Sequence, residues 1–556
     1  MRISRIKIDG YKSLNNFEAS FSKEKTVIIG QNASGKSNFL EALVIIFKNL
    51  DLGESPEFDF VILYNINNKD IVIKGFGKTN LKNKYAFWEI EKPTNALFDD
   101  TPQIIERLFS DQNVRGNIKV NDFRKKKDLY LPKHVFVYYS GLGNSNRLEE
   151  ILQKPDYDYA TSLMKTDGEV VKDRRFFYVR LHHSNFVLLS FYAIDLEDDI
   201  KAFLKENLKI ENLETILFVL KQPYWKGAKK DGDPKFWGST GVVSNFLNDL
   251  YKIATAPLRE YRPHRIDIWR EQKEERLFLY ISDIQKIKKL VLDRKWDNIQ
   301  FFNVLESINA SDLHRDIRLR IRKNYAGNIT FRDLSEGEQQ LLTVLGLMRF
   351  TRYEESLYLL DEPDTHLNPY WRWKYMDFIS KVAVMPTTSQ VIMTSHDALT
   401  IGSLNKEEVR IFESNIESGR IRTFLPNEDP KGMGVAGILT EIFYLQTTLD
   451  KKTQDQLDER RNLESKLYNQ KRGLLTLDNR EIKDIESRVS KLNAILDELG
   501  FSRVTRDPLY QKFQARFDAR MNYEKFNEKP LTQDEKEKQI ELIDSILKDM
   551  LDEEGI

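Results

Sequence analysis

The first 50 residues alternate apolar and polar positions in an order that predicts strand, loop, strand, loop and helix. The stretch "RIKIDGYKSL" (5–14) carries Ile6 and Ile8 at alternate positions and turns at Gly10. The run "KTVIIG" (25–30) predicts a short buried strand, and "LEALVIIF" (40–47) predicts an apolar helix. Four later stretches are rich in β-branched and aromatic residues, and we expect a mostly antiparallel sheet from them: "FVILYNI" (60–66), "IVIKGFG" (71–77), "YAFWEI" (85–90) and "HVFVYYSG" (134–141).

The same pattern divides the rest of the chain into parts with different elements. Residues 1–144 hold the strands and the helix above, whereas residues 145–327 mix helical stretches with polar loops and predict an α+β insertion. Residues 328–435 return to strand–helix alternation, and residues 436–556 have a helical, highly charged pattern. We therefore predict an α/β fold with mixed β-sheet lobes, an α+β insertion and a helical C-terminal region.

The C-terminal region contains one heptad seam. Asp478 and Glu481 match an N-terminal capping box, and Gly500 is placed to end the helix. Apolar residues between them are spaced three and four apart: Ile482, Ile485, Val489, Leu492, Leu496 and Leu499. A short antiparallel helical hairpin is the simplest structure. Two interpretations stay open, an amphipathic pair packed on the domain and a partner-binding arm.

Composition limits the classes of function. The chain has 556 residues, with 86 Lys+Arg against 86 Asp+Glu, so any surface for nucleic acid has to be local. Cysteine is absent, which excludes disulfides, cysteine-ligated zinc and thiol chemistry and is compatible with the cytoplasm. We expect no signal peptide and no transmembrane helix, because long apolar runs are missing.

Two glycines, a lysine and a serine stand between the strand at 25–30 and the helix at 40–47. Their spacing from Gly30 to Ser37 is G-x-x-x-x-G-K-S. In such a loop the backbone N–H groups and the helix N-terminus point at a polyphosphate, Lys36 reaches the terminal phosphates, and the Ser37 hydroxyl binds Mg²⁺. A turn with an incidental lysine is the alternative, and the strand before and helix after favour the phosphate loop. The predicted nucleotide-binding residues here are Gly30, Asn32, Gly35, Lys36, Ser37 and Asn38.

Three more motifs stand later in the chain. The buried strand in "SLYLLDEPDTH" ends at Asp361 and Glu362, where one carboxylate can hold Mg²⁺ and the next can deprotonate the attacking water. In "LSEGEQQLL", Ser335 and Glu338 match a capping box that opens a helix, and Gly337 permits a close backbone approach. The strand in "VIMTSHD" ends at His396, whose imidazole could contact a γ-phosphate.

In this order the motifs resemble the ABC-type, AAA-family ATPase head of the SMC-like and OLD-like branch. The resemblance implies that Gly30–Ser37 is the Walker A loop, that Ser335, Gly337 and Glu338 form the signature motif, and that ATP and Mg²⁺ are bound. It further implies Asp361 as the metal carboxylate, Glu362 as the general base, Asp364 as the start of the D-loop and His396 as the switch histidine. Lys12 in "GYKS" matches a basic residue near the nucleotide in such heads. The Q-loop glutamine could not be placed.

The resemblance also implies a dimer, because the signature motif of such heads faces the ATP of a second subunit. Long coiled coils are missing from the insertion, and no strands of a Toprim nuclease domain are apparent after residue 425. The chain is most similar to the Septu-type (PtuA-like) ATPases of bacterial anti-phage defence, also found in retron modules. Such ATPases work with a separate HNH nuclease and, in retrons, with a reverse transcriptase and its RNA–DNA hybrid. The alternative is a stand-alone SMC-like DNA-binding ATPase in repair or clamp function.

Basic segments are the other sign of nucleic acid. In "HRDIRLRIRK", Arg318, Arg320 and Arg322 alternate with apolar residues, so a strand there would place three guanidiniums on one face. An ordinary solvated face is the alternative. The runs "RKKK" (124–127) and "KIKK" (286–289) are short and flanked by acids. The pair His182–His183 has no carboxylate at ligand spacing in the sequence, and we interpret it as structural.

Overall fold

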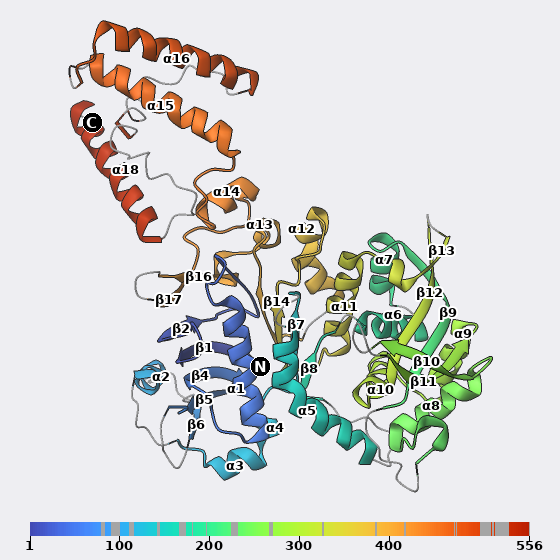
Figure 1. The fold of residues 1–556 in the computed structure, drawn as a ribbon. Helices are drawn as coiled ribbons and strands as arrows, with labels where there is room; N and C mark the ends of the chain where they lie inside the picture. The colour runs from blue at the N-terminus through green and yellow to red at the C-terminus, as the bar shows by residue number, and fades with distance from the viewer. Residues whose placement is uncertain are drawn as a thin grey trace. The chain divides into compact units, whose positions relative to one another are not determined.

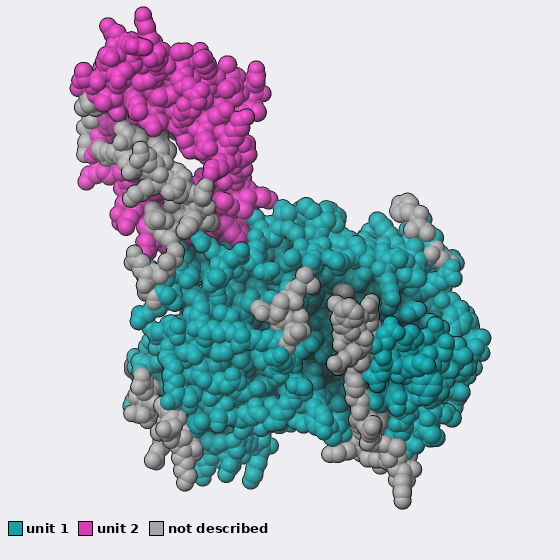
Figure 2. Space-filling model, viewed as in Figure 1, with its two compact units in different colours: residues 1–426 teal, residues 427–556 magenta. Residues whose placement is uncertain are grey.

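The computed structural model divides the chain into two compact units, residues 1–426 and residues 427–556 (Figure 2). It describes the whole chain apart from residues 79–83, 91–100, 111–115, 142–144, 166–173, 181, 196, 224–231, 266–270, 325–326, 384–385, 416–418, 472, 474, 501–512, 514–515, 518–532 and 555–556. The architecture is α/β, as predicted, and the sheets all belong to the first unit (Figure 1). The finer boundaries predicted at 144 and 327 stay predictions.

The central sheet of the first unit has seven strands in the order β17-β16-β3-β15-β14-β7-β8. All neighbours in this sheet are parallel except β17, which runs antiparallel to β16. The strands are β3 (Lys25–Gly30), β7 (Val135–Tyr139), β8 (Phe176–Tyr178), β14 (Leu357–Asp361), β15 (Gln390–Thr394), β16 (Val409–Ser414) and β17 (Ile421–Phe424). Every residue of β14 and β15 is buried, as expected for parallel strands covered on both faces.

The N-terminal sheet is antiparallel, with the order β2-β1-β4-β5-β6. Its strands are β1 (Arg2–Asp9), β2 (Phe17–Ser20), β4 (Asp59–Ile66), β5 (Lys69–Gly75) and β6 (Tyr85–Ile90). Helix α1 (Lys36–Leu52) shares its core with this sheet and the central one. The ring centroids of Phe17, Phe39 and Phe412, from β2, α1 and β16, lie 5.2–5.6 Å apart. This packing fixes the start of α1 beside the end of β3.

The prediction for residues 134–141 is wrong in its pairing. The strand forms, as β7, but it does not join the antiparallel group of β4, β5 and β6. It pairs in parallel with β14 and β8 in the central sheet. The reason is long-range: both faces of β7 are apolar near its start, so it is stable only between other buried strands.

The inserted sheet is antiparallel, in the order β10-β11-β9-β12-β13, and is packed on one face by helices (Figure 1). Its strands are β9 (Ile210–Lys221), β10 (Leu258–Arg265), β11 (Glu271–Ile281), β12 (His314–Lys323) and β13 (Gly327–Thr330). The α-helices of this region are α5 (Ser145–Lys165), α6 (His183–Ala193), α7 (Asp198–Glu206), α8 (Gly241–Ile253), α9 (Ile284–Asp293) and α10 (Asn298–Ala310). The predicted α+β character of the insertion is therefore observed, although β8 joins the central sheet.

The remaining helices of the first unit flank the two lobes. They are α2 (Thr101–Ser110), α3 (Val120–Lys125), α4 (Lys127–Tyr130), α11 (Glu336–Phe350), α12 (Pro369–Phe378) and α13 (Ala398–Ile401). A turn of π-helix, Ile379–Ala383, continues α12, so the helix predicted near 369–383 is present with a change of geometry.

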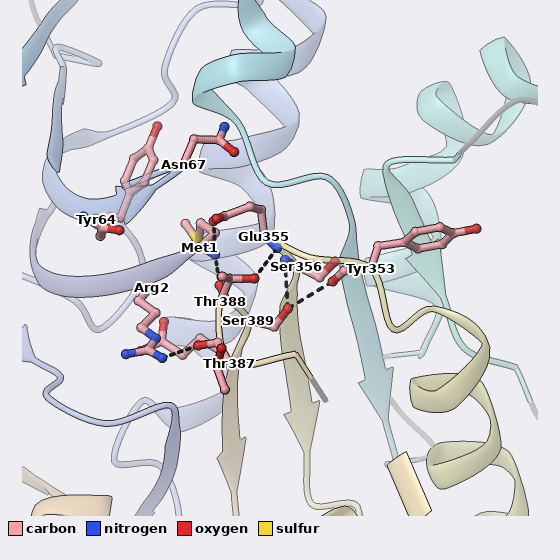
Figure 3. Close-up of polar contacts among 12 residues, drawn as sticks. Met1, Arg2, Tyr64, Asn67, Tyr353, Glu355, Ser356, Thr387, Thr388 and Ser389 are labelled. Carbon is pink, nitrogen blue, oxygen red and sulfur yellow. Dashed lines mark hydrogen bonds and ion pairs between the residues drawn. The ribbon is translucent and has the colours of Figure 1, made fainter. Parts of the chain in front are cut away.

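The amino ends of β14 and β15 are tied together by polar contacts (Figure 3). The Ser356 N–H donates to the Ser389 hydroxyl at 3.2 Å, and the Glu355 N–H donates to the Thr388 hydroxyl at 3.1 Å. The terminal ammonium of Met1 binds the Glu355 carboxylate and the Thr388 carbonyl oxygen. These contacts hold the register of the two strands at the end away from the candidate site.

The second unit is helical, with α14 (Gly434–Glu441), α15 (Lys451–Lys471), α16 (Asn479–Glu498) and α18 (Gln533–Glu554). The predicted hairpin is present, because α15 packs against α16 through the heptad seam, with Val489, Leu492 and Leu496 buried. The predicted capping box also forms: the Asp478 carboxylate accepts from the Glu481 N–H at 2.6 Å. Among the helices that the structure describes, none is both long and apolar enough to span a membrane.

Candidate active site

Parallel strands bring the predicted motifs to one edge of the central sheet. In the ladder, Asp361 at the end of β14 is the partner of Thr394 on β15 and of Tyr139 on β7. On the other side of β15 lies β3, whose last residue is Gly30. Since the carboxyl ends of parallel strands share one edge, the loops after β3, β7, β14 and β15 meet there.

The loop from Gly30 to Ser37 needs its glycines for close packing. A Cβ on Gly30 would lie 2.2 Å from the Phe412 carbonyl oxygen, and one on Gly35 would lie 2.4 Å from the Ile421 side chain. Gly35 also has φ +86°, in the left-handed region, and serves as the N-cap of α1. The backbone therefore turns tightly from strand to helix, and the N-terminus of α1 opens toward the loop, as an anion site requires.

Lys36 reaches back over this loop. Its ammonium donates to the carbonyl oxygens of Gly30 at 2.9 Å and Gln31 at 3.0 Å. Burial lowers the pKa of Lys36 to about 8, and the Glu362 and Asp361 carboxylates nearby oppose this shift only in part. A buried cation held by carbonyls at the head of a helix is prepared to exchange them for phosphate oxygens.

This lowered pKa predicts how ATP binding depends on pH. Above about pH 8 a growing share of free protein carries neutral Lys36, whereas phosphate favours the charged form. We expect the apparent Kd for ATP to rise between pH 8 and pH 9, by up to about fivefold if only the charged form binds. Titration of a fluorescent ATP analogue at each pH measures this. Lys36→Ala should bind weakly with a flat profile, and a flat wild-type profile would contradict the prediction.

Asp361 is buried beside the phosphate loop. Its carboxylate accepts from the Thr394 hydroxyl, and the Ser37 hydroxyl hydrogen-bonds to the same group. Burial raises the pKa of Asp361, with these two hydrogen bonds opposing. Carboxylate and hydroxyl oxygens are the donors that Mg²⁺ prefers, and its charge would offset the cost of burying the carboxylate. The donor set formed by Ser37 and Asp361 therefore fits Mg²⁺.

Glu362 faces His396 across the same edge. The His396 Nε2 lies 2.7 Å from the Glu362 Oε1, and both side chains are about one-third exposed, at 37% and 34%. The hydrogen bond from His396 lowers the pKa of Glu362, with burial opposing, so the carboxylate is ionised at neutral pH. An ionised carboxylate oriented by an imidazole at a partly open edge can accept a proton from water.

The backbone of Glu362 is unusual. Its φ is +50°, in the left-handed region, and its N–H donates to the Thr394 hydroxyl at 3.0 Å. Thr394 thus holds both Asp361 and Glu362, and it was missed by the sequence analysis. Its only sequence signal is its place at the end of the strand before His396. Left-handed backbone at a non-glycine residue costs energy and is found preferentially at functional sites.

Ser140 stands where β7 ends, next to these residues. Its N–H donates to the Asp361 carbonyl oxygen at 3.2 Å, and its hydroxyl lies 3.5 Å from that of Thr365. The Q-loop glutamine could not be placed from the sequence, because the strands after the first helix were too ambiguous to choose between. The strand beside β14 ends at Tyr139 and is followed by Ser140 and Gly141, with no glutamine at either position.

Asp364, predicted to begin the D-loop, is buried. Its carboxylate accepts from the hydroxyls of Ser395 at 2.6 Å and Thr400 at 2.5 Å. Burial raises its pKa, with those hydrogen bonds opposing. Asp364 therefore connects the loop after β14 to the loop after β15 by hydrogen bonds. This connection fixes the positions of Glu362 and His396 relative to each other.

The predicted signature residues lie at the start of α11. Ser335 is the N-cap, and its capping box with Glu338 is complete: the Glu338 Oε2 accepts from the Ser335 N–H at 2.9 Å. The other carboxylate oxygen of Glu338 accepts from the Lys323 ammonium at 2.5 Å. Gly337 packs against the loop after β14, where a Cβ would lie 2.6 Å from the His366 carbonyl oxygen. Ser335 itself is exposed, and the hydrogen bonds of its side chain are to Glu338, not to the Gly30–Ser37 loop.

Lys12 and Asn38 lie at the start of α1. The Lys12 ammonium donates to the Asn38 side-chain oxygen at 3.2 Å and binds the Glu41 carboxylate, which also binds Arg147. This places Lys12 near the first turn of α1, and its role beside the nucleotide stays a prediction. Asn32 is exposed at the tip of the loop.

The histidine pair acquires a carboxylate that the sequence did not reveal. The His183 Nε2–H donates to the Glu306 Oε2 at 3.0 Å, and the Arg180 N–H donates to the His183 Nδ1 at 2.8 Å. Glu306 also binds Arg174 at 2.9 Å. Because Nδ1 accepts a hydrogen bond from the Arg180 N–H, Nε2 carries the hydrogen, so His183 belongs to a buried polar network in the insertion.

Residues 1–398 match the protein family described as AAA ATPase domain. The chain belongs to this AAA ATPase domain family. This AAA ATPase is therefore an enzyme that binds ATP and hydrolyses it to ADP and phosphate. The matched range contains the phosphate loop, Ser335, Asp361, Glu362 and His396. The second unit lies outside it.

Comparison with solved structures finds SMC head domains. The AAA ATPase is 12% identical to an SMC head bound to the C-winged helix domain of ScpA, with a TM-score of 0.32, covering 76% of this chain and 98% of that one. It is 11% identical to the SMC head domain from Thermotoga maritima, with a TM-score of 0.30, covering 76% and 99%. It is 11% identical to an Smc head with an extended coiled coil from Pyrococcus furiosus, bound to the C-terminal domain of ScpA, with a TM-score of 0.31, covering 76% and 96%. A comparison with curated proteins finds no match.

Proposed function

We propose that this AAA ATPase is an SMC-like ATPase subunit of a bacterial anti-phage defence complex. Two copies close on two ATP molecules, and their closure regulates a separate HNH-type nuclease. One observation carries the first part. The phosphate loop and its carboxylates share the edge of the central sheet, whereas Ser335 lies exposed at the N-terminus of another helix and does not bond to that loop. An exposed helix N-terminus is suited to a phosphate from another molecule.

Within one copy, the proposed roles follow the geometry described above. Lys36 and the start of α1 bind the β- and γ-phosphates, and Ser37 with Asp361 holds Mg²⁺, which neutralises phosphate charge when bound. Glu362 takes the proton from the attacking water, and His396 orients that carboxylate through the 2.7 Å hydrogen bond. Asn32, Asn38 and Lys12 lie around the same loop and complete the nucleotide site.

Mixing two inactive variants tests the composite site. Ser335→Arg should block hydrolysis because the larger side chain breaks the capping box and would clash with the facing ATP. Lys36→Ala should fail for a different reason, loss of its own ATP. A mixed dimer joins one intact phosphate loop to one intact signature, so ATP turnover should return in the mixture, measured as phosphate release.

Light scattering on the same samples distinguishes the outcomes. If mixed dimers form but ATP turnover does not return, the two ATP sites hydrolyse ATP only when both are intact. Full turnover by Ser335→Arg alone would contradict the role of Ser335 in a second copy's site.

The nuclease partner is supported by the sequence resemblance to Septu-type ATPases. Purifying the tagged chain with the proteins of its neighbouring genes tests it. We expect an HNH protein to co-elute and, if the system is a retron, a reverse transcriptase with its RNA–DNA hybrid.

ATP turnover by the chain alone that is stimulated by DNA, with no co-eluting nuclease, would favour the second candidate. That candidate is a stand-alone DNA-binding ATPase, and the exposed guanidiniums of Arg318, Arg320 and Arg322 favour it.

A further inference from the structure

The inserted sheet has one face covered by helices and one face with exposed side chains. Helices α6, α9 and α10 pack on the sheet, where alternate residues such as Ile317 and Leu319 are buried. The other face carries a row across three strands. In the ladders, Leu217 on β9 is the direct partner of both Tyr280 on β11 and Arg318 on β12, so the three side chains point the same way. The Tyr280 side chain is 40% exposed.

Arginines exceed carboxylates on the β12 side of this face. Arg318, Arg320 and Arg322 are all exposed and lie about 6.6 Å apart along the strand. Asp316 is shared by Arg318 at 2.9 Å and Arg332 at 2.6 Å, and Glu214 pairs with Arg322 at 2.6 Å. Arg320 has no ion-pair partner in the described part of the chain. The arginine face, defined by Arg318, Arg320, Arg322 and Arg332, thus carries a surplus of positive charge.

We propose that this face of the inserted sheet, the arginine face together with Tyr280, binds single-stranded nucleic acid. Evenly spaced guanidiniums on a strand suit a row of phosphates, and they contact a backbone without reading its sequence. An exposed aromatic ring on the neighbouring part of the sheet offers a stacking surface for an unpaired base, which duplex DNA cannot present. The ring and the charges together favour a single strand over a duplex or an acidic protein.

The arginine face is connected to the proposed signature motif. Strand β12 ends at Lys323, whose ammonium binds the Glu338 carboxylate that completes the Ser335 capping box. Both charged side chains are mostly buried, with exposed fractions of 16% and 15%. Nucleic acid bound at Arg318–Arg322 would contact β12, and β12 is linked to Ser335 through the Lys323–Glu338 ion pair and the hydrogen bond between Glu338 and Ser335. This link to ATP rests on the proposed function, whereas binding of nucleic acid by the face does not.

Fluorescence anisotropy with a labelled single-stranded DNA of about 30 nucleotides tests the binding. We expect the triple variant Arg318→Gln, Arg320→Gln, Arg322→Gln to bind at least about tenfold more weakly, and its salt dependence (log K against log salt) to flatten by about 2. The matched control is Lys119→Gln, Lys125→Gln, Lys126→Gln, which removes the same charge from exposed positions of the N-terminal lobe. Equal losses in both variants, or no binding by the wild type at low salt, would overturn the proposal.

Variants of Tyr280 test whether the face prefers single-stranded nucleic acid to other polyanions. Tyr280→Ala should lower the affinity for single-stranded DNA by about fivefold or more and leave the affinity for duplex DNA unchanged. Tyr280→Phe should keep the wild-type affinity for single-stranded DNA. A duplex of the same sequence, or polyglutamate, that binds as tightly as the single strand would overturn the choice of ligand. Repeating the titration with Lys36→Ala, which cannot use ATP, separates this claim from the proposed function: binding should persist there. Unfolding temperatures of all variants confirm that each is folded.

Discussion

Replacing Glu362 by glutamine should lower ATP turnover by about 10²- to 10⁴-fold while leaving ATP binding nearly unchanged. The amide keeps the size of the side chain and can still meet His396, but it cannot accept a proton from water. The phosphate loop and Asp361 are untouched, because Glu362 contacts His396 and Thr365 by its side chain and Thr394 by its backbone. Steady-state phosphate release and equilibrium binding of labelled ATP measure the two quantities separately.

A matched variant defines what this result means. Glu354→Gln changes an exposed glutamate just before β14, at the end of that strand away from the candidate site. It should retain most of the turnover. Wild-type turnover in Glu362→Gln would place the general base elsewhere and would leave the His396–Glu362 pair as a structural contact.

Lys36→Ala should weaken ATP binding by about 30-fold or more and abolish turnover. The reason is the burial of this ammonium, which is 6% exposed and bound to the Gly30 and Gln31 carbonyl oxygens. Removing it deprives the phosphates of their one charge partner within the loop. Equilibrium titration with labelled ATP measures the loss.

Lys25→Ala provides the control, because Lys25 lies at the opposite end of β3 and binds Ser380 at 2.5 Å. It should bind ATP like the wild type. Wild-type affinity in Lys36→Ala would mean that the loop from Gly30 to Ser37 is not the nucleotide site.

Local spacing explains why much of the site was predictable. The glycines of the phosphate loop and the capping boxes at Ser335 and Asp478 depend on residues three to seven positions apart, and each is present as expected. The strands β14 and β15 could be recognised because they are apolar runs ending in polar residues. Asp361 and His396 were each predicted to act on the nucleotide, and the parallel pairing of β14 with β15 puts both strand ends at one edge.

Long-range pairing explains what the sequence could not predict. Strand β7 has the composition of the antiparallel strands, and its partners β14 and β8 lie far away in the chain. Because the pairing of β7 with β14 was not predicted, the position of Ser140 beside Asp361 could not be predicted either. In the same way Glu306 is separated from His183 by 123 positions, and the Lys323–Glu338 ion pair has no periodic signal. Side chains that packing brings together from distant parts of the chain have no fixed spacing in the sequence, so their contacts cannot be predicted from it.

The central claim is that a second copy completes each ATP site. Turnover per chain, measured against protein concentration with light scattering on the same samples, tests it most directly. The account predicts that turnover per chain is negligible when the protein is monomeric and rises together with the ATP-dependent dimer. Constant turnover per chain across the monomeric range, with no dimer detected, would contradict the composite site and the role proposed for Ser335.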